Sequence, residues 1–437
     1  MSKDAINTSG AVRLRLPQRD QVLWQAQCLD DLLPKEHRAR TLWAIVCKLD
    51  LSAFEWPIKA RQGVVGRDAT DRRILVALWL YASLRGIGSA HELARLCQDH
   101  RGYRWLCGGV TLNHRLLSDF RGDHADALDG LFANVIATLV HKGLVSVRRI
   151  SQDGLRVRAS AGSSSFRRGS TLEKLRQEAA EQMKALRQLF DDPQASAGLS
   201  ARQKAAKERA ARQRQQRIEQ AAALIPKLQA RQEQSARRMS KTQKSTQQTT
   251  PRASTSDVDA RRMKMGDGGY RPALNVQIAC DTNSRAIVAL EVSNQGVDYE
   301  QSEPLRKQAE QTTQQKVAEH LYDGGYVKRE CIERATQQGV TIYAPPKPPK
   351  NPDQRADGCD PCAGDSPALA QWRTRMGSDQ GKAIYQQRAA TSETINAQMR
   401  RQGLTQLTVR GLRKAKCIAL WAALAYNLTL FASQLLA

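Results

Sequence analysis

Apolar residues recur at helical spacing through the first third of the chain. The segment 71–86, DRRILVALWLYASLRG, keeps its apolar residues at this spacing and ends at a break with two glycines. Ser89 stands at an N-cap position before a second amphipathic segment, and a third begins near residue 111. Residues 1–143 are therefore predicted to form an all-α N-terminal domain.

Two of these predicted helices are joined by a short glycine turn. That arrangement fits a helix-turn-helix that reads DNA, and it fits equally well a pair of helices that only pack together. The spacing leaves both interpretations open.

From residue 144 the pattern changes to that of strands. A β-rich run covers 144–158, and its apolar part stops at a lone acid, Asp153. Two further runs, 272–281 and 285–293, are separated by Thr-Asn-Ser and predict a hairpin.

Helix and strand patterns alternate after this hairpin. Residues 303–315 predict a helix, a short strand ends at Asp323, residues 327–339 predict another helix, and 340–345 predict a strand. This order is typical of an α/β fold with a mixed sheet, here built from residues 144–437.

Residues 171–247 interrupt that domain. They are rich in Ala, Gln, Arg, Lys and Glu, with a turn at 191–198, and predict an inserted helical hairpin. Basic residues outnumber acidic ones in it. The insertion could be a solvated hairpin, an arm along DNA phosphates, or a protein–protein contact in a dimer.

Charge narrows the class of partner. The 437 residues carry a formal net charge of +25, with a pI of about 10.0, so a polyanion such as nucleic acid is expected. No apolar signal segment opens the chain, and the nine scattered cysteines are typical of reduced, cytoplasmic thiols.

Two local features suggest other classes, and neither is favoured. Cys359 and Cys362 have CxxC spacing without a second pair, so structural zinc is not expected. The terminal residues 417–437 carry no charge and could span a membrane, but Asn427 and Thr429 interrupt them. We expect a buried terminal helix and no membrane partner.

Three acids occupy positions where structure could make them useful. Asp153 is predicted to end the first strand, Asp323 to end a later strand, and Glu393 to lie on a helix. Sites in α/β sheets form at the carboxyl ends of strands, and carboxylates there could hold two Mg²⁺ ions for phosphodiester chemistry. Asp281 and Asp267 are the alternative acids, since one ends a strand and the other precedes paired glycines.

Each of these acids also has an ordinary explanation. Asp153 and Asp323 both precede glycine and could start turns, and Glu393 could pair with Arg388 on one helical face. Spacing alone does not decide between the two interpretations.

Six segments, taken in order, resemble one family. They are QDGLRVRASAGSSSFRRGSTLE, ALNVQIACD, LYDGGYVKRECIE, GVTIYAPPKPPKNP, GDSPALAQWRTRMG and YQQRAATSETINAQ. In this order they resemble bacterial insertion-sequence transposases of the DDE class, in the branch with an InsH-type N-terminal domain and an RNase H-like catalytic core. The resemblance runs from about residue 40 to residue 430.

The resemblance implies a fold, a site and a cofactor. Residues 144–437 would form an RNase H-like mixed-sheet catalytic core, preceded by an N-terminal domain that binds DNA. Asp153, Asp323 and Glu393 would be both the catalytic residues and the ligands of two Mg²⁺ ions, with Mn²⁺ as a possible substitute.

It also implies DNA contacts. They are Arg156, Arg158, Arg167 and Arg168 near the first acid, and Tyr385, Arg388 and Arg400 near the glutamate. Two departures from the family pattern bear on them: four residues rather than three separate Arg388 from Glu393, and Arg400 stands where lysine is usual.

The implied activity is DNA transposition. Water would cleave the transposon ends, and the exposed 3′-hydroxyls would attack target DNA, with a homodimer assembled on double-stranded DNA at the bacterial nucleoid. The alternatives are a metal-dependent nuclease that does not join ends and a catalytically inactive DNA-binding relative.

Overall fold

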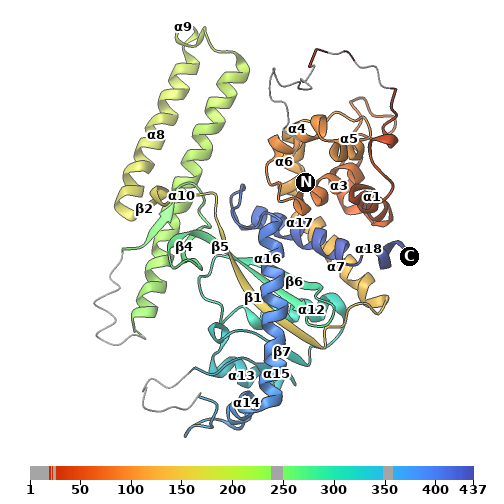
Figure 1. Ribbon diagram of the computed structural model, residues 1–437. Helices are drawn as coiled ribbons and strands as arrows, with labels where there is room; N and C mark the ends of the chain where they lie inside the picture. Colours follow the sequence, from red (N-terminus) through yellow and green to blue (C-terminus); the bar gives the residue numbers. More distant parts are fainter. Residues whose placement is uncertain (1–18, 21, 23–25, 238–249, 348–357) are drawn as a thin grey trace, which may run out of the picture.

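The computed structural model describes residues 19–20, 22, 26–237, 250–347 and 358–437 of the chain. A helical N-terminal region precedes a mixed β-sheet, and a long helical hairpin projects away from the rest of the molecule (Figure 1). The helical, sheet and hairpin regions follow the chain order that the sequence predicts.

Short helices build the N-terminal region. They are η1 (Asp30–Leu32), α1 (Arg38–Lys48), α2 (Ser52–Glu55), α3 (Arg72–Leu84), α4 (Ala90–Asp99), α5 (Arg101–Cys107), α6 (His114–Asp123) and α7 (Ala125–His141). Helix α3 is buried from Ile74 to Ser83, as expected for a central helix. The predicted cap is confirmed, because the Ser89 hydroxyl accepts a hydrogen bond from the Glu92 N–H.

The C-terminal helices pack against this region. Helix α17 (Leu412–Leu430) contacts α3, α6, α7 and strand β6, and α18 (Ala432–Leu436) follows it. One apolar core therefore extends from the N-terminal helices into the sheet. No helix in the described part of the chain is long and apolar enough to cross a membrane.

The sheet has a mixed topology. Its strands are β1 (Arg149–Arg158), β4 (Arg261–Lys264), β5 (Tyr270–Asp281), β6 (Ile287–Ser293), β7 (Glu319–Leu321) and β8 (Thr341–Tyr343). Strand β5 pairs antiparallel with β1 on one side and with β4 and β6 on the other, while β7 and β8 continue the sheet in parallel beyond β1. The predicted β5–β6 hairpin is confirmed, and the order is that of an RNase H-like core.

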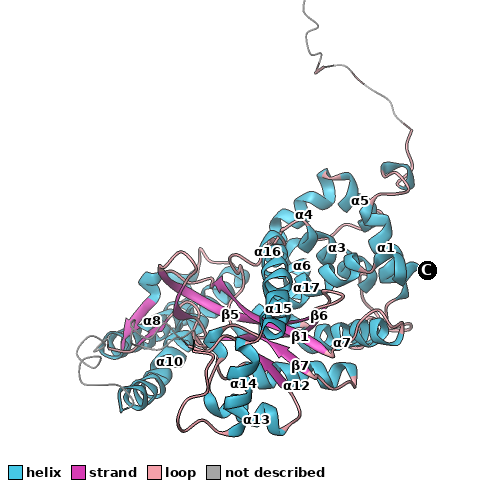
Figure 2. Cartoon of the chain, turned by 60° about the horizontal axis from the view of Figure 1, so that its bottom comes forward, coloured by secondary structure: helices cyan, strands magenta, loops and turns pink. Residues whose placement is uncertain are grey.

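Helices connect and cover these strands. They are α12 (Ser302–Thr313), η3 (Gly324–Tyr326), α13 (Arg329–Gln337), α14 (Pro367–Gly377), α15 (Asp379–Arg388), η4 (Ala389–Glu393) and α16 (Thr394–Arg401). The segment α15–η4–α16 is continuous and passes along the sheet (Figures 1 and 2). It is the element that brings Glu393 near the strands.

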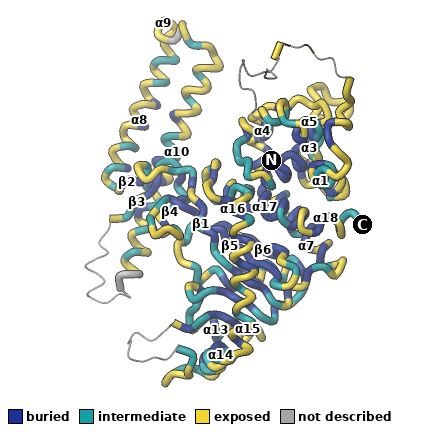
Figure 3. The backbone as a smooth tube through the Cα atoms, in the orientation of Figure 1, coloured by how far each residue is buried: buried dark blue, intermediate teal, exposed yellow. Residues whose placement is uncertain are grey.

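The insertion is a helical hairpin, as its composition predicts. It comprises α8 (Gly169–Asp191), the short α9 (Pro193–Ser196) and α10 (Ala201–Arg237), and residues 238–249 of the predicted range lie outside the described residues. Strands β2 (Phe166–Arg168) and β3 (Arg252–Ser254) pair at its base and tie its two ends together. Most of its surface is exposed (Figure 3).

Gly381 marks a close approach between α14 and α15. A Cβ atom there would overlap the backbone carbonyl oxygen of Arg375, whereas one at Gly130 on α7 would meet nothing within 4 Å. We predict that Gly381→Ala destabilises the fold by about 1–3 kcal/mol, because backbone must move. Gly130→Ala should be neutral or slightly stabilising. Chemical denaturation measures both, and equal effects would contradict this packing argument.

His320 on β7 gives the fold a pH dependence. Burial and the Arg306 guanidinium lower the pKa of His320 from 6.5 to about 3. Below pH 6.5 His320 is protonated in the unfolded chain but stays neutral in the folded chain. The folded state therefore loses stability relative to the unfolded state as the pH falls from 6.5 toward 3.

We predict that His320→Gln weakens this dependence. Denaturation at pH 7.5, 6 and 5 should show wild type losing up to about 1.4 kcal/mol per pH unit more than the variant. His141→Gln, at an exposed position on α7, should leave the wild-type dependence unchanged. Parallel curves for wild type and His320→Gln would refute the prediction.

Candidate active site

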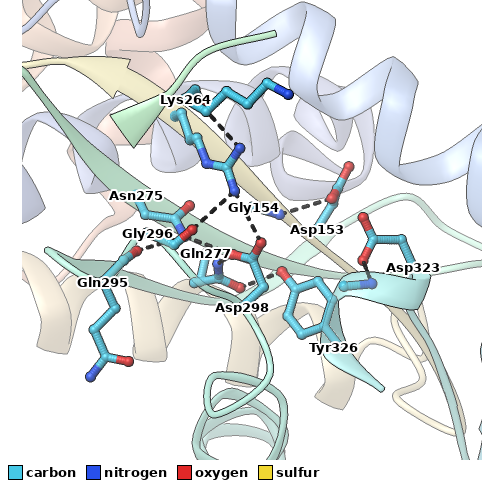
Figure 4. A network of polar contacts seen from close by, with 12 residues as sticks. Asp153, Gly154, Lys264, Asn275, Gln277, Gln295, Gly296, Asp298, Asp323 and Tyr326 are labelled. Carbon is cyan, nitrogen blue, oxygen red and sulfur yellow. Dashed lines mark hydrogen bonds and ion pairs between the residues drawn. The ribbon is translucent and has the colours of Figure 1, made fainter. Parts of the chain in front are cut away.

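The register of two parallel strands brings Asp153 and Asp323 together. Ser151 on β1 is paired with Leu321 on β7. Two residues further along each chain stand Asp153 and Asp323, and their carboxylates lie beside each other (Figure 4). The carboxyl ends of parallel strands meet at one edge of a sheet, which is where sites form in α/β folds.

The sequence suggested that Asp153 ends its strand, and this prediction is wrong. Strand β1 continues to Arg158, and Asp153 is paired with Ile278 of β5. What ends near Asp153 is only the pairing with β7, which stops at Ser151 because β7 is short. The long buried strand β5 pairs with β1 as far as Arg158 and so holds the second half of β1 in extended form.

A tight turn fixes Asp323. The Gly325 N–H donates to Asp323 Oδ1 over 2.7 Å, at the start of the 3-10 turn η3. A Cβ atom at Gly325 would lie 2.9 Å from that same oxygen. The second glycine of the predicted pair is therefore needed so that the chain can close tightly around the carboxylate.

Arg388 lies between the two aspartates. Its Nη2 is 3.3 Å from Asp153 Oδ1 and 3.9 Å from Asp323 Oδ2. Burial raises the pKa of Asp153, Arg388 opposes that shift, and the neighbouring Asp323 and Asp298 charges add to it. Two carboxylates are thus held close in a partly desolvated place, and the Arg388 guanidinium makes the charged form of Asp153 less unfavourable.

The helical segment above these residues contains a π-helical turn. Residues Ala389–Glu393 of η4 separate the α-helices α15 and α16. In a π-turn, residues five apart are neighbours, whereas in an α-helix residues three or four apart are. The π-helical turn therefore accommodates the extra residue between Arg388 and Glu393, because it keeps residues five apart on the same side of the helix.

Two contacts anchor this segment to β1. The Ser392 and Ser151 hydroxyls are 2.6 Å apart, and Asn396 Nδ2 donates to Asp153 Oδ2 over 2.9 Å. Glu393 lies next to Ser392 and is exposed, and in the described residues its carboxylate has no hydrogen bond or ion pair. Asn396 was missed from the sequence, where nothing distinguishes it from a surface amide.

The described residues contain no cluster of three or more His, Cys, Asp or Glu side chains that could hold a metal ion. The donor chemistry nevertheless fits a divalent cation. Asp153 and Asp323 present adjacent carboxylate oxygens, the ligands that Mg²⁺ and Mn²⁺ prefer, and they already share one cation, Arg388. The exposed Glu393 is the nearest further acid on the helical segment that contacts β1.

A polar network supports the other face of β1. Asp298 Oδ1 accepts hydrogen bonds from Asn275 Nδ2 over 2.7 Å and Gln277 Nε2 over 2.8 Å, and Gln277 in turn accepts one from the buried Tyr326 hydroxyl. Arg156 joins this network through Asp298. Because side chains alternate along a strand, the network lies on the face opposite to that of Asp153.

Gly154 leaves room for this network. A Cβ there would lie 2.7 Å from Gln277 Nε2 and 2.9 Å from Asp298 Oδ1. Asp298 and Gln277 were not predicted from the sequence. Alternating polar residues in the buried run Asn-Val-Gln-Ile of β5 are the signal that could have indicated them.

The remaining residues predicted to contact DNA differ in their exposure and in their contacts with the rest of the fold. Arg156 donates to the Lys264 and Gly296 carbonyls, so its guanidinium is engaged in the fold. Half-buried Tyr385 has a raised pKa because of burial, with Arg388 nearby opposing the shift. The other four are exposed: Arg158 at the end of β1, Arg167 and Arg168 on β2, and Arg400 on α16.

The two alternative acids lie away from this place. Asp281 is buried at the far end of β5, paired with Ile150, and caps the β5–β6 turn by accepting from the Ser284 N–H. Asp267 is exposed in the β4–β5 turn and pairs with Arg271. Neither one lies beside Asp153.

Comparison with protein-family models gives two matches. Residues 27–123 match the Transposase domain (DUF772), and residues 238–428 match the Transposase DDE domain. No curated protein and no solved structure gave a significant match. The two matched domains follow the same order as the N-terminal helices and the RNase H-like sheet. The second match includes the segments that carry Asp323 and Glu393. The chain belongs to the DDE transposases of insertion sequences.

Proposed function

We propose that this transposase cleaves the ends of its insertion sequence and joins them to target DNA, with Asp153, Asp323 and Glu393 as its catalytic carboxylates. The observation that carries the proposal is the pair of aspartates at one edge of the sheet, which share Arg388. Water would attack a phosphodiester at the transposon end and release a 3′-hydroxyl. That hydroxyl would then attack target DNA, with a target 3′-oxygen as the leaving group.

DDE transposases generally use divalent metal ions, and we propose two Mg²⁺ ions here, with Mn²⁺ able to substitute. Asp153, Asp323 and Glu393 would hold them, and when bound they would supply charge stabilisation for the attacking and leaving oxygens. The chain's own part is to keep Asp153 and Asp323 adjacent, with the Arg388 guanidinium beside both carboxylates. Asn396 orients Asp153, and Gly325 orients Asp323.

DNA phosphates would be held by cations around this edge. Arg158, Arg167, Arg168 and Arg400 are exposed and suit that role, and Arg388 and Tyr385 adjoin the aspartates. Arg156 acts instead as a support, because Asp298 and two carbonyls hold its guanidinium. Joining two ends requires two active sites, so we propose a homodimer on DNA.

The hairpin would be a DNA-binding arm, and its charge is concentrated on α10. Between residues 201 and 217 seven basic residues accompany one acid, Glu208, whereas basic and acidic residues balance on α8. The rival role is dimer contact. Of the apolar residues that could serve it, Ile218 is 2% exposed and is already used inside the hairpin.

A nuclease that does not join ends is the second candidate. It would share Asp153 and Asp323 and the same hydrolytic step. Supercoiled plasmids with and without the transposon ends separate the two, because only a transposase yields joined products that depend on those ends.

We predict that Asp323→Asn lowers end cleavage by more than about a hundredfold while DNA affinity stays nearly unchanged. The substitution removes a charged ligand and leaves the arginines that would contact phosphate. Cleavage of labelled end duplexes in Mg²⁺, with binding measured by fluorescence anisotropy, checks both halves.

Asp267→Asn is the matched control, since Asp267 also precedes paired glycines but lies in the exposed β4–β5 turn. It should cleave like wild type. Strand transfer at the wild-type rate by Asp323→Asn would remove this residue from the active site.

We predict that neutralising three exposed cations of α10, in the triple variant Arg202→Gln, Lys207→Gln and Arg209→Gln, weakens end binding. If each contacts a phosphate, the slope of log affinity against log salt should flatten by about 2.7. The matched variant on α8, Lys174→Gln, Lys184→Gln and Arg187→Gln, should keep the wild-type slope. An unchanged slope for the α10 variant, together with a shift from dimer to monomer, would favour the rival role.

A further inference from the structure

A cavity of about 830 Å³ lies between α13, α14 and the end of β8. This volume is in the range of sites that bind small molecules. Its apolar wall includes Leu369 and Trp372. Its charged lining includes five basic residues, Lys328, Arg329, Arg334, Lys347 and Arg373, against two acidic ones, Glu300 and Glu330.

The sheet places this cavity one strand beyond the aspartates. Leu321 of β7 is paired with Ser151 on one side and with Tyr343 of β8 on the other. Two residues further, Pro345 follows β8 at the level of Asp323, and a Cβ on Gly324 would touch the Pro345 oxygen at 3.6 Å. Lys347, two residues after Pro345, lines the cavity, so the cavity begins one strand beyond the active-site edge.

Two of the basic residues are held in place before any ligand binds. Asp365, whose side chain is 2% exposed, pairs with Arg329 at 3.1 Å and with Arg373 at 2.8 Å. Lys328 lies over the Tyr299 ring, 3.4 Å from its centroid, and 3.8 Å from Glu300. Asp365 thus orients two guanidinium groups, and Arg334 pairs with Glu303 at 3.6 Å. The five basic residues therefore face four acids, Glu300, Glu303, Glu330 and Asp365, which leaves an excess of one positive charge.

A cationic rim beside an apolar wall suits one ligand class, a nucleotide, which combines an anionic phosphate with a flat apolar base. We propose that the cavity holds a nucleotide of the DNA strand that passes Asp153 and Asp323, adjacent to the reacting phosphodiester. This inference rests on the proposed DNA cleavage and joining. A free nucleotide has the same chemistry, but the position next to the aspartates favours the strand.

Photocross-linking of the full chain locates such a nucleotide. End duplexes would carry 5-iododeoxyuridine one to four positions from the cleaved bond on either side, in separate substrates. We expect cross-links in peptides covering residues 327–334 or 369–373 from positions on one side only. Cross-linking requires binding but no cleavage, so it reports on the cavity even if the proposed activity fails.

Substitution gives the second readout. The double variant Lys328→Gln, Lys347→Gln should slow end cleavage and flatten the salt slope of binding by about 1.5–2. Lys316→Gln is the matched control, because Lys316 is exposed before the amino end of β7, at the opposite edge of the sheet.

The outcomes separate the possibilities. If wild type and Lys316→Gln cleave DNA, a double variant with normal cleavage and slope and no cavity cross-links would overturn the inference while leaving the proposed function intact. If dTMP binds the cavity in equilibrium dialysis while the double variant binds and cleaves DNA normally, the ligand is a free nucleotide and the strand proposal is wrong. Absence of DNA cleavage by wild type would count against the proposed function alone.

Discussion

The candidate active site depends on keeping two carboxylates side by side at the edge of a sheet. In water Asp153 and Asp323 would separate, but backbone pairing of β1 with β7 fixes the strands that carry them. Their repulsion raises the pKa of Asp153 in addition to the effect of burial, and Arg388 reduces that cost. Two adjacent carboxylates favour a positive charge between them, which suits the site to a divalent cation, and such a cation can in turn bind a phosphate.

The rest of the core stabilises that edge from two sides. On the Asp153 face, Ser392 and Asn396 hold the helical segment against β1. On the opposite face, Asp298 collects hydrogen bonds from two amides of β5 and a salt bridge from Arg156. A polar network of this kind is costly when a partner is missing, so it favours one arrangement of strand β1.

The N-terminal helices are joined to the helical segment that carries Glu393. Gly86, with a φ of 69°, lies in the turn after α3, where a Cβ would be 2.9 Å from the Arg401 carbonyl oxygen at the end of α16. Thr408 donates to the Gly88 carbonyl in the same turn. Helix α17 completes the contact by packing against α3 and α7. The N-terminal helices and α16 are therefore joined by close backbone packing.

The sequence by itself determined the types of most elements and the hairpin, because these depend on local periodicity, helix propensity and capping. Helix α3, the β5–β6 hairpin and the α8–α10 insertion could be predicted because each depends on residues near one another in the chain. The predicted residues Asp153, Asp323 and Arg388 also stood out locally, through their flanking glycines or their family motif.

Only the tertiary structure decided how these pieces meet. Strand β1 continues past Asp153, but its pairing with β7 stops at Ser151. Asp153 is therefore unpaired on the β7 side because β7, about 170 residues away in the chain, is short. The π-helical turn before Glu393, the role of Asp298 and the cavity at Lys347 likewise depend on contacts between distant segments. Long-range register and side-chain packing are set by the whole fold, so no local pattern in the chain specifies them.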